Sequence, residues 1–315
     1  MESMRAVVLD RFGGPEVLTL GQRSVPQPLP TEIRVRVAAA GVNPVDCKTR
    51  AGLGMSPFLG GLPAVLGWEV SGAVESVGTG VTQFAVGDPV YGMPWFPRQA
   101  GGYAEFVTAP SRQFAARPAG LDDVAAAALP LAGLTAWQAL VDLARITEDQ
   151  RVLVHAAAGG VGHLAVQIAK SRGAYVIGTA SSAKHRALGE LGLDEAVNYQ
   201  GTRFEQVLEP VDVVLDLLGG EVAARSLDVL RPNGLLITLP SRGAAEVVAM
   251  ASARGFRASG MVVEPDGTGL RQLGELVAAG GLRPLVAETF PLDRAGDAHR
   301  LSESGRTTGK IVLTV

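Results

Sequence analysis

The chain has 315 residues, which is long enough for two domains that each bury a core. Hydrophobic residues make up 47% and charged residues 19%, a balance typical of folded globular proteins and not of disordered ones. A formal net charge of −3 provides no basic surface for a nucleic acid or an anionic membrane, so neither is an expected partner.

The single cysteine, Cys47, excludes an internal disulfide, a four-cysteine zinc site and a redox Cys-x-x-Cys pair. The longest apolar stretch, residues 124–140, contains Pro130 and Gly133 and falls short of the about 20 residues that a membrane span needs. The first residues lack the apolar region of a secretory signal. We therefore expect a cytoplasmic protein.

The first third of the chain has the pattern of short strands separated by glycine and proline. Residues 32–37 (EIRVRV) alternate polar and apolar, which predicts a half-buried antiparallel strand, and residues 70–77 have a similar rhythm. Turn signals such as Gly13-Gly14-Pro15 interrupt these runs. This region is predicted to be a β-rich domain.

The pattern changes near Leu121, where Asp122 and Asp123 are placed to open a helix. Short β-branched runs then alternate with amphipathic segments, which predicts a parallel sheet with helices on both faces. The fold class is therefore α/β, with a doubly wound Rossmann domain over residues 122–258. Residues 4–121 and 259–315 form the β-rich substrate domain. The predicted strands are 152–154, 175–177, 211–215, 235–237 and 310–315, and the predicted helices are 160–172, 183–191 and 222–230.

The strongest local signal is the segment 152–162 (VLVHAAAGGVG), in which a strand ends in small residues and a helix follows. Ala157 stands at the first position of the Gly-x-Gly-x-x-Gly pattern, with Gly159 and Gly162 at the other two. Small residues let the backbone approach a pyrophosphate, whose charge is favoured by free amides at a helix N-terminus. We predict dinucleotide binding here, with Gly173 ending the helix.

The next strand indicates which dinucleotide is bound. A site selective for NAD offers a carboxylate about 20 residues on, whereas here the strand ends in Thr-Ala-Ser-Ser, followed by Lys184 and Arg186. The Ser181 hydroxyl and the Lys184 ammonium suit a 2′-phosphate, so the predicted cofactor is NADPH. The alternative is that Lys184 and Arg186 are solvated charges on a helix surface.

Over essentially its whole length the chain resembles the quinone oxidoreductase (zeta-crystallin-like) branch of the medium-chain dehydrogenase/reductase superfamily. The resemblance rests on several motifs in the right order, and it implies that the β-rich domain is GroES-like. Besides the turn at 156–162, the motifs are residues 41–46 (GVNPVD), 66–69 (LGWE), 86–92 (VGDPVYG), 102–105 (GYAE) and 309–313 (GKIVL).

The resemblance also implies that no metal takes part. Asn43 and Trp68 stand where the zinc enzymes of the superfamily have a ligand cysteine and a ligand histidine, and neither supplies a thiolate or an imidazole. Cys47 is offset from the ligand position, so we interpret it as a packing residue.

By the same resemblance, Asn43 lies beside the nicotinamide ribose, Thr135 near the nicotinamide ring, and Lys184 with Tyr199 at the 2′-phosphate. Tyr199 as a loop aromatic and Leu218 as plain core are the alternatives. The predicted cofactor-binding residues are Asn43, Thr135, Ala158, Gly159, Gly160, Val161, Ser181, Lys184, Tyr199, Leu218, Leu239, Val262 and Lys310.

The predicted acceptor pocket combines Asn43 with Met55, Trp95, Phe96 and Met261, whose apolar side chains suit a planar ring. The alternative is that this loop packs on the protein's own core or on a second subunit. The resemblance further implies a homodimer joined through the edge of the Rossmann sheet, near residues 235–239 and Met261.

The predicted reaction is hydride transfer from NADPH to a small quinone or another α,β-unsaturated carbonyl. Tyr91, Tyr103, Asp46 and solvent are all candidate proton sources, and no catalytic acid is assigned. Two other interpretations remain: a pathway-specific enoyl reductase of secondary metabolism, and an NADPH-binding sensor or structural protein without catalysis.

Overall fold

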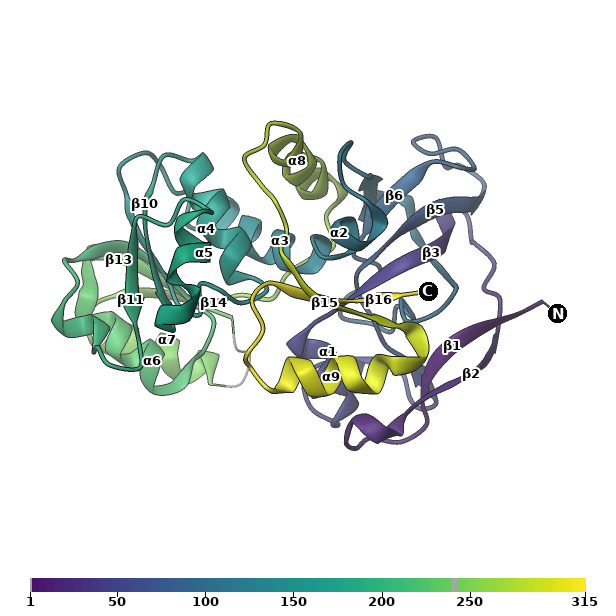
Figure 1. Cartoon of the computed structure of the whole chain (residues 1–315), viewed down its shortest axis with the longest axis horizontal. Coiled ribbons are helices and arrows are strands. Elements are labelled where there is room, and N and C mark those ends of the chain that lie inside the picture. The colour runs from purple at the N-terminus through teal and green to yellow at the C-terminus, as the bar shows by residue number, and fades with distance from the viewer. Residues whose placement is uncertain (1, 240–242) are drawn as a thin grey trace. The chain divides into compact units, whose positions relative to one another are not determined.

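The computed structural model describes residues 2–239 and 243–315, which form two compact units (Figure 1). The first unit comprises Met1–Leu134, Glu264–Ala279 and Pro284–Val315, and the second comprises Thr135–Val263 and Gly280–Arg283. The sequence-based ranges grouped residues 122–134 with the Rossmann domain and 259–263 with the β-rich domain. The contacts within the structure instead place residues 122–134 in the first unit and residues 259–263 in the second.

The second unit is built on a six-stranded, wholly parallel sheet in the order β11-β10-β9-β12-β13-β14. This is the strand order of a doubly wound dinucleotide-binding domain, so the predicted Rossmann-type fold is confirmed. The strands are β9 (Arg151–Val154), β10 (Tyr175–Ala180), β11 (Glu195–Asn198), β12 (Val211–Asp216), β13 (Leu230–Thr238) and β14 (Arg257–Gly260); the helices are α4 (Gly162–Ser171), α5 (His185–Gly189), α6 (Gly220–Ser226) and α7 (Ala244–Ala253).

The central strands of this sheet read as apolar runs because both of their faces are covered. Leu153, Ile177, Val214 and Leu236 have no exposed surface and belong to one core cluster. Helix α4 ends where the sequence predicts: Gly173 has a φ of +79° and its amide donates to the Lys170 carbonyl at 2.9 Å.

The free edge of the sheet differs from the expectation for the dimer. Residues 235–238 lie in β13, which pairs on one side with β12 and on the other with β14. The edge strand on this side of the sheet is therefore β14, directly before Met261, and β11 is the other edge strand. The placement of residues 235–239 at the edge was wrong. The sequence of β14, RASG, contains no β-branched residue, so its pattern gives no strand signal.

The first unit contains a larger mixed sheet, β15-β16-β3-β5-β6-β8 with β7 also on β3, and a small sheet, β2-β1-β4. Its strands are β1 (Ser3–Leu9), β2 (Leu18–Ser24), β3 (Glu32–Val42), β4 (Ala64–Val65), β5 (Val70–Val77), β6 (Pro89–Gly92), β7 (Phe106–Pro110), β8 (Phe114–Ala116), β15 (Val286–Pro291) and β16 (Lys310–Thr314). Its helices are α1 (Pro44–Arg50), α2 (Asp123–Ala127), α3 (Pro130–Trp137, whose last residues enter the second unit), α8 (Gly267–Ala278) and α9 (Ala295–Glu303).

Strand β3 is longer and more deeply buried than the alternating pattern predicts. It pairs with β5, β7 and β16, and two of its polar side chains, Glu32 and Arg34, are buried. Arg34 donates from Nε to Glu75 at 2.5 Å, and Glu32 accepts the Leu29 amide at 3.0 Å. The half-buried interpretation was wrong at these two positions because both groups have partners that offset their loss of water.

Over the residues that the structure describes, no helix is both long and apolar enough to cross a membrane.

The predicted helix start at Asp122 is confirmed: its carboxylate accepts the Ala125 amide at 2.8 Å as the N-cap of α2. We expect Asp122→Ala to weaken this helix end by about 1 kcal/mol, seen as about fivefold faster hydrogen exchange of the Ala125 amide. Asp122→Asn keeps an acceptor and serves as the control. Unchanged exchange in Asp122→Ala would contradict the assigned cap.

Candidate functional site

The predicted cofactor residues of the second unit follow the carboxyl ends of its parallel strands. Ser181 directly follows β10 and Tyr199 directly follows β11, with Ala180 paired opposite Asn198. Leu218, Leu239 and Val262 come within two residues of the ends of β12, β13 and β14. Because these ends meet at one edge of the sheet, the fold gathers these five residues, and those of the turn after β9, at the edge where doubly wound sheets bind ligands.

The turn after β9 is held to the neighbouring strand by hydrogen bonds. The Ala157 amide donates to the Thr179 carbonyl at 3.0 Å, and the Ala156 amide donates to the Thr179 hydroxyl at 3.2 Å. His155, which is 1% exposed, lies between the hydroxyls of Thr179 (3.1 Å from Nδ1) and Ser226 (2.8 Å from Nε2). The start of the turn is thereby fixed before any ligand binds.

The rest of this turn leaves backbone donors open. Among the described residues, no acceptor is hydrogen-bonded to the amides of Ala158, Gly160 and Val161, which directly precede helix α4. Gly162 lets this segment lie close to the strand end, since an added Cβ would come within 2.3 Å of the Ala156 carbonyl oxygen. Unpaired amides at the start of a ten-residue helix fit a phosphate group.

The segment directly after β10 carries a cation and no acid, and an aromatic residue directly follows β11. Lys184 lies in the short helical turn Ser182–Lys184, and burial lowers the pKa of its ammonium. Residues 179–186 (TASSAKHR) include no carboxylate. Tyr199 is 62% exposed. This combination fits a 2′-phosphate, which a carboxylate would repel.

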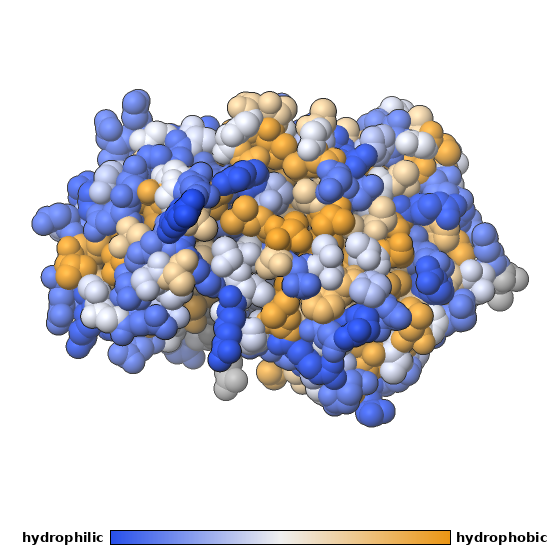
Figure 2. Space-filling model, in the orientation of Figure 1, coloured by the Kyte–Doolittle hydropathy of each residue, from blue (hydrophilic) through white to orange (hydrophobic). Residues whose placement is uncertain are grey.

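Three large apolar side chains at the same edge are exposed: besides Tyr199, Leu218 is 53% and Val262 is 52% exposed. The alternative interpretation of Leu218 as plain core is therefore wrong. Figure 2 shows that exposed apolar residues are interspersed among hydrophilic ones on the displayed face. Apolar side chains left in contact with water at this edge suit a ligand with flat rings. Thr135, by contrast, is buried in α3.

Asp216, at the end of β12, was missed by the sequence reasoning. It has no exposed surface and accepts hydrogen bonds from the amides of Leu218 (3.0 Å) and Gly219 (2.9 Å) and from the Thr238 hydroxyl (2.7 Å). Asp216 therefore shapes the turn that presents Leu218. The acid at the end of an apolar strand, VDVVLD, was the available signal.

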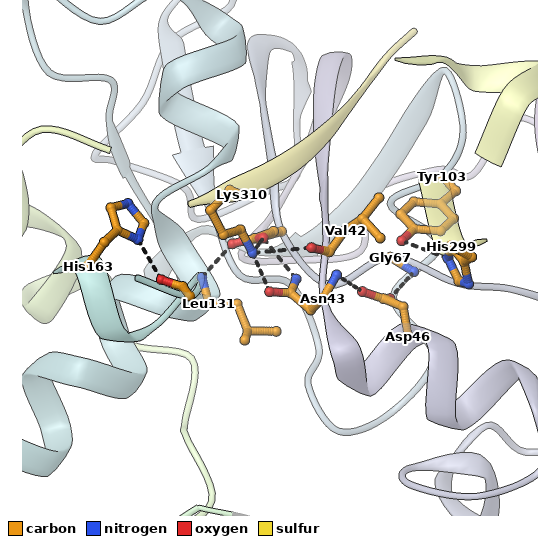
Figure 3. A network of polar contacts seen from close by, with 11 residues as sticks. Val42, Asn43, Asp46, Gly67, Tyr103, Leu131, His163, His299 and Lys310 are labelled. Atoms are coloured by element: carbon orange, nitrogen blue, oxygen red, sulfur yellow. Dashed lines mark hydrogen bonds and ion pairs between the residues drawn. The ribbon is translucent and has the colours of Figure 1, made fainter. Parts of the chain in front are cut away.

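A second polar cluster lies in the first unit, around Asn43 at the N-cap of α1 (Figure 3). Its Nδ2 donates to Glu69 Oε1 at 2.8 Å, and its Oδ1 accepts from Lys310 Nζ. Lys310 Nζ also lies 2.5 Å from Glu69 Oε1 and 3.4 Å from the Val42 carbonyl oxygen. Lys310 and Asn43 are each 3% exposed, and Glu69 is fully buried. Glu69 was quoted only as part of a motif, so its place in the cluster was missed.

The three side chains considered as proton donors are all fully buried. Asp46 accepts the amides of Asn43 (2.9 Å) and Gly67 (3.2 Å), and burial raises the pKa of this carboxyl to about 7. Tyr103 lies 3.3 Å from His299 Nε2, and Tyr91 donates to the Leu270 carbonyl at 2.5 Å. Burial raises the pKa of both phenols. These groups are committed to internal partners, and none is assigned as the catalytic acid.

The predicted pocket residues have different environments. Phe96 is buried and contacts the Trp68 ring edge-on at 5.5 Å between centroids, so for Phe96 the alternative of core packing holds. Trp95 and Met55 are partly exposed, and the Trp95 indole donates to the Thr108 carbonyl at 2.8 Å. Met261 belongs to the second unit, where its amide donates to the Thr238 carbonyl at 3.2 Å.

Neither position that the resemblance relates to zinc offers a free metal ligand. Trp68 is buried with its indole donating to the Arg98 carbonyl at 2.6 Å, and Asn43 is engaged as described. Cys47 is buried, and its burial raises the thiol pKa to about 12. In residues 2–239 and 243–315 no group of three or more His, Cys, Asp or Glu is placed to hold a metal ion.

Comparisons with known proteins agree with both units. The family model of the alcohol dehydrogenase GroES-like domain matches residues 29–119, and that of the zinc-binding dehydrogenases matches residues 191–313. A 2-haloacrylate reductase from a Burkholderia species is 35% identical over 98% of both chains. The solved quinone oxidoreductase of Coxiella burnetii is 38% identical, with a TM-score of 0.95 over the whole of both chains. A mycobacterial protein solved in complex with NADPH is 30% identical, with a TM-score of 0.86 over 99% of this chain and 100% of that one.

The close approach at Gly162 predicts that Gly162→Ala destabilises the protein by at least about 1–3 kcal/mol, because the added methyl meets backbone atoms that cannot move aside. Urea unfolding would measure the change. The control is Gly189→Ala in helix α5, where an added Cβ meets nothing within 4 Å. This substitution is expected to leave the free energy of unfolding unchanged or to raise it slightly. Equal effects of the two substitutions would contradict the assigned packing.

The environment of His155 predicts a loss of stability in acid. Burial lowers the pKa of its imidazole from 6.5 to about 4, so between these pH values only the unfolded state takes up the proton. As the pH falls from 6.5 to 4, His155 thus removes up to about 3 kcal/mol from the free energy of unfolding.

Urea titrations at several pH values, comparing the wild type with His155→Gln, would isolate this contribution from those of the other groups. We expect the difference in stability between the two proteins to change steadily over that pH range. A difference that does not depend on pH would show that His155 stays protonatable in the folded state.

Proposed function

Because the chain belongs to the quinone oxidoreductase-like branch of the medium-chain dehydrogenase/reductase superfamily, we propose that it is an NADPH-dependent, zinc-independent reductase of quinones or other conjugated carbonyl compounds. Membership makes it an NAD(P)H-dependent oxidoreductase; the preference for NADPH and the acceptor class are the proposal. The observation that carries it is the carboxyl edge of the sheet, where the amides of Ala158, Gly160 and Val161 have no acceptor among the described residues and Lys184 lies in a segment, 179–186, that contains no carboxylate.

Different residues of the second unit would bind different parts of the cofactor. The amides of Ala158, Gly160 and Val161 bind the diphosphate, and Ser181, Lys184 and Tyr199 hold the 2′-phosphate. The exposed side chains of Leu218 and Val262, with Leu239, cover flat rings and exclude water from them. Thr135 and Gly159 remain predicted contacts, whereas Lys310, predicted as another, is buried in the first unit. When bound, NADPH supplies the hydride.

The acceptor class follows from the chemistry of the donor set. Asn43 and Trp68 provide neither a thiolate nor an imidazole for a zinc ion that would polarise a simple carbonyl. A conjugated acceptor needs less help, since its own π-system spreads the developing charge. The names of the two similar proteins, a 2-haloacrylate reductase and a quinone oxidoreductase, both describe acceptors of this kind. An enoyl reductase of a biosynthetic pathway is the second candidate, since it would share every cofactor residue.

The assembly proposed with this function is a homodimer joined through the edge of the Rossmann-type sheet. Both edge strands, β11 and β14, lack an outer partner strand among the described residues, and β14 is the one next to Met261, where the dimer contact is expected. A monomeric mass at micromolar concentration would count against the dimer and leave the enzymatic proposal untouched.

The decisive experiment measures NADPH and NADH binding by nucleotide fluorescence in the wild type, Lys184→Ala and Tyr199→Ala. We expect the wild type to prefer NADPH and each substitution to weaken NADPH binding about tenfold, because a hydrogen bond to a charged group is worth about 1.5–3 kcal/mol. NADH binding should change little. Arg186→Ala is the matched control, since this cation is 92% exposed and pairs with Glu190.

Panels of quinones, enones and enoyl thioesters, added to the same samples, would then identify the acceptor by the consumption of NADPH. Turnover with quinones or simple enones supports the proposal, and turnover with enoyl thioesters alone supports the second candidate. Binding of NADPH with no turnover on any panel member would indicate a sensor or structural protein.

A further inference from the structure

We propose that Glu69 and Lys310 act together as positioning residues that lock the side-chain amide of Asn43 in a single orientation, which leaves one of its Nδ2 hydrogens for a ligand. The inference rests on the proposed function, for which the family resemblance implies that Asn43 lies beside the nicotinamide ribose. It assigns Glu69 a role, and it replaces the direct cofactor contact expected of Lys310 with an indirect one.

The orientation of the amide follows from the chemistry of its two neighbours. An ammonium group only donates hydrogen bonds and an ionised carboxylate only accepts them. Lys310 must therefore meet the Asn43 oxygen, and Glu69 must meet the Asn43 nitrogen, as the structure has them. A flipped amide would set donor against donor and acceptor against acceptor inside a buried cluster, where unpaired groups are most costly.

Lys310 has no donor to spare for a cofactor phosphate. Its ammonium carries three N–H groups, and three acceptors surround it: Glu69 Oε1, Asn43 Oδ1 and the Val42 carbonyl oxygen. The side chain is also 3% exposed. These contacts make Lys310 an internal support of Asn43.

Glu69 is itself fixed by a hydrogen bond beyond those to Asn43 and Lys310. Its second oxygen, Oε2, accepts the amide of Leu131 at 2.8 Å near the start of α3. The backbone of Asn43 is fixed independently, because its amide donates to Asp46 at 2.9 Å in a capping box. What remains open on Asn43 is the second Nδ2 hydrogen, for which no acceptor exists among the described residues. A ligand hydroxyl or carbonyl oxygen can accept it.

The first test needs no cofactor and compares the wild type with the double variant Glu69→Gln/Lys310→Met. Removing both charges avoids leaving one of them buried and unpaired, so the fold is expected to persist. We expect the Asn43 side-chain amide, identified in NMR spectra by its loss in Asn43→Ala, to exchange its hydrogens at least tenfold faster in the double variant. Equal exchange rates in a folded double variant would overturn the inference.

The second test asks whether the pair acts through Asn43, by measuring kcat, KM and NADPH affinity in a mutant cycle. The double variant is expected to lower kcat/KM at least tenfold in the wild-type background and to have no further effect in the Asn43→Ala background. Independent, multiplying effects in the two backgrounds would show that Lys310 or Glu69 acts by its own contacts. A merely structural role would lower stability equally in both backgrounds without this dependence on Asn43.

A matched control is the Lys170–Asp194 pair of the second unit, with 2.8 Å between Nζ and Oδ2, beside the start of β10 at the opposite edge of the sheet. Lys170→Met/Asp194→Asn should leave NADPH binding, turnover and Asn43 exchange unchanged. A wild type that neither binds NADPH nor reduces a conjugated acceptor would overturn the proposed function. The exchange measurement would still decide separately whether the amide is locked.

Discussion

The arrangement of the first unit depends on one carboxylate, Glu69, which has no contact with water. A buried charge costs several kcal/mol unless a partner and hydrogen bonds offset the loss of hydration, and Glu69 obtains these from Lys310, Asn43 and Leu131. The ends of β3, β16 and α3 thereby meet at a single group. Only glycine fits at position 41, since a Cβ there would lie 2.1 Å from the Glu69 carboxylate.

The second unit combines turns that are fixed by buried polar residues with backbone amides that have no acceptor among the described residues. His155 and Asp216 are buried polar residues whose partners fix the turns after β9 and β12. Within the first of these turns, three backbone amides have no acceptor among the described residues, those of Ala158, Gly160 and Val161. A rigid frame with a few open donors binds an anion without first having to reorganise.

Sequence reasoning succeeded where adjacent residues decide the local structure, and it failed where contacts with residues distant in the sequence decide it. Asp122 caps its helix and Gly173 ends another, because these roles depend on a few adjacent residues. Phe96 had the composition of a pocket wall, yet it is buried against Trp68, a contact that no periodicity reveals. The exposure of Leu218 likewise depends on Asp216, because its carboxylate accepts the Leu218 amide and fixes the conformation of the turn.

The sequence by itself determined the two kinds of domain, the parallel sheet, the cofactor turn and the family, because period, turn residues and motif order are properties of consecutive residues. Only the tertiary structure decided which strand is the sheet edge and which side chains are buried. It also decided that Asn43, Glu69 and Lys310, far apart in the chain, form one cluster. The reason is physical: the cost of burying a charge or an amide is set by its surroundings, and distant segments supply those surroundings.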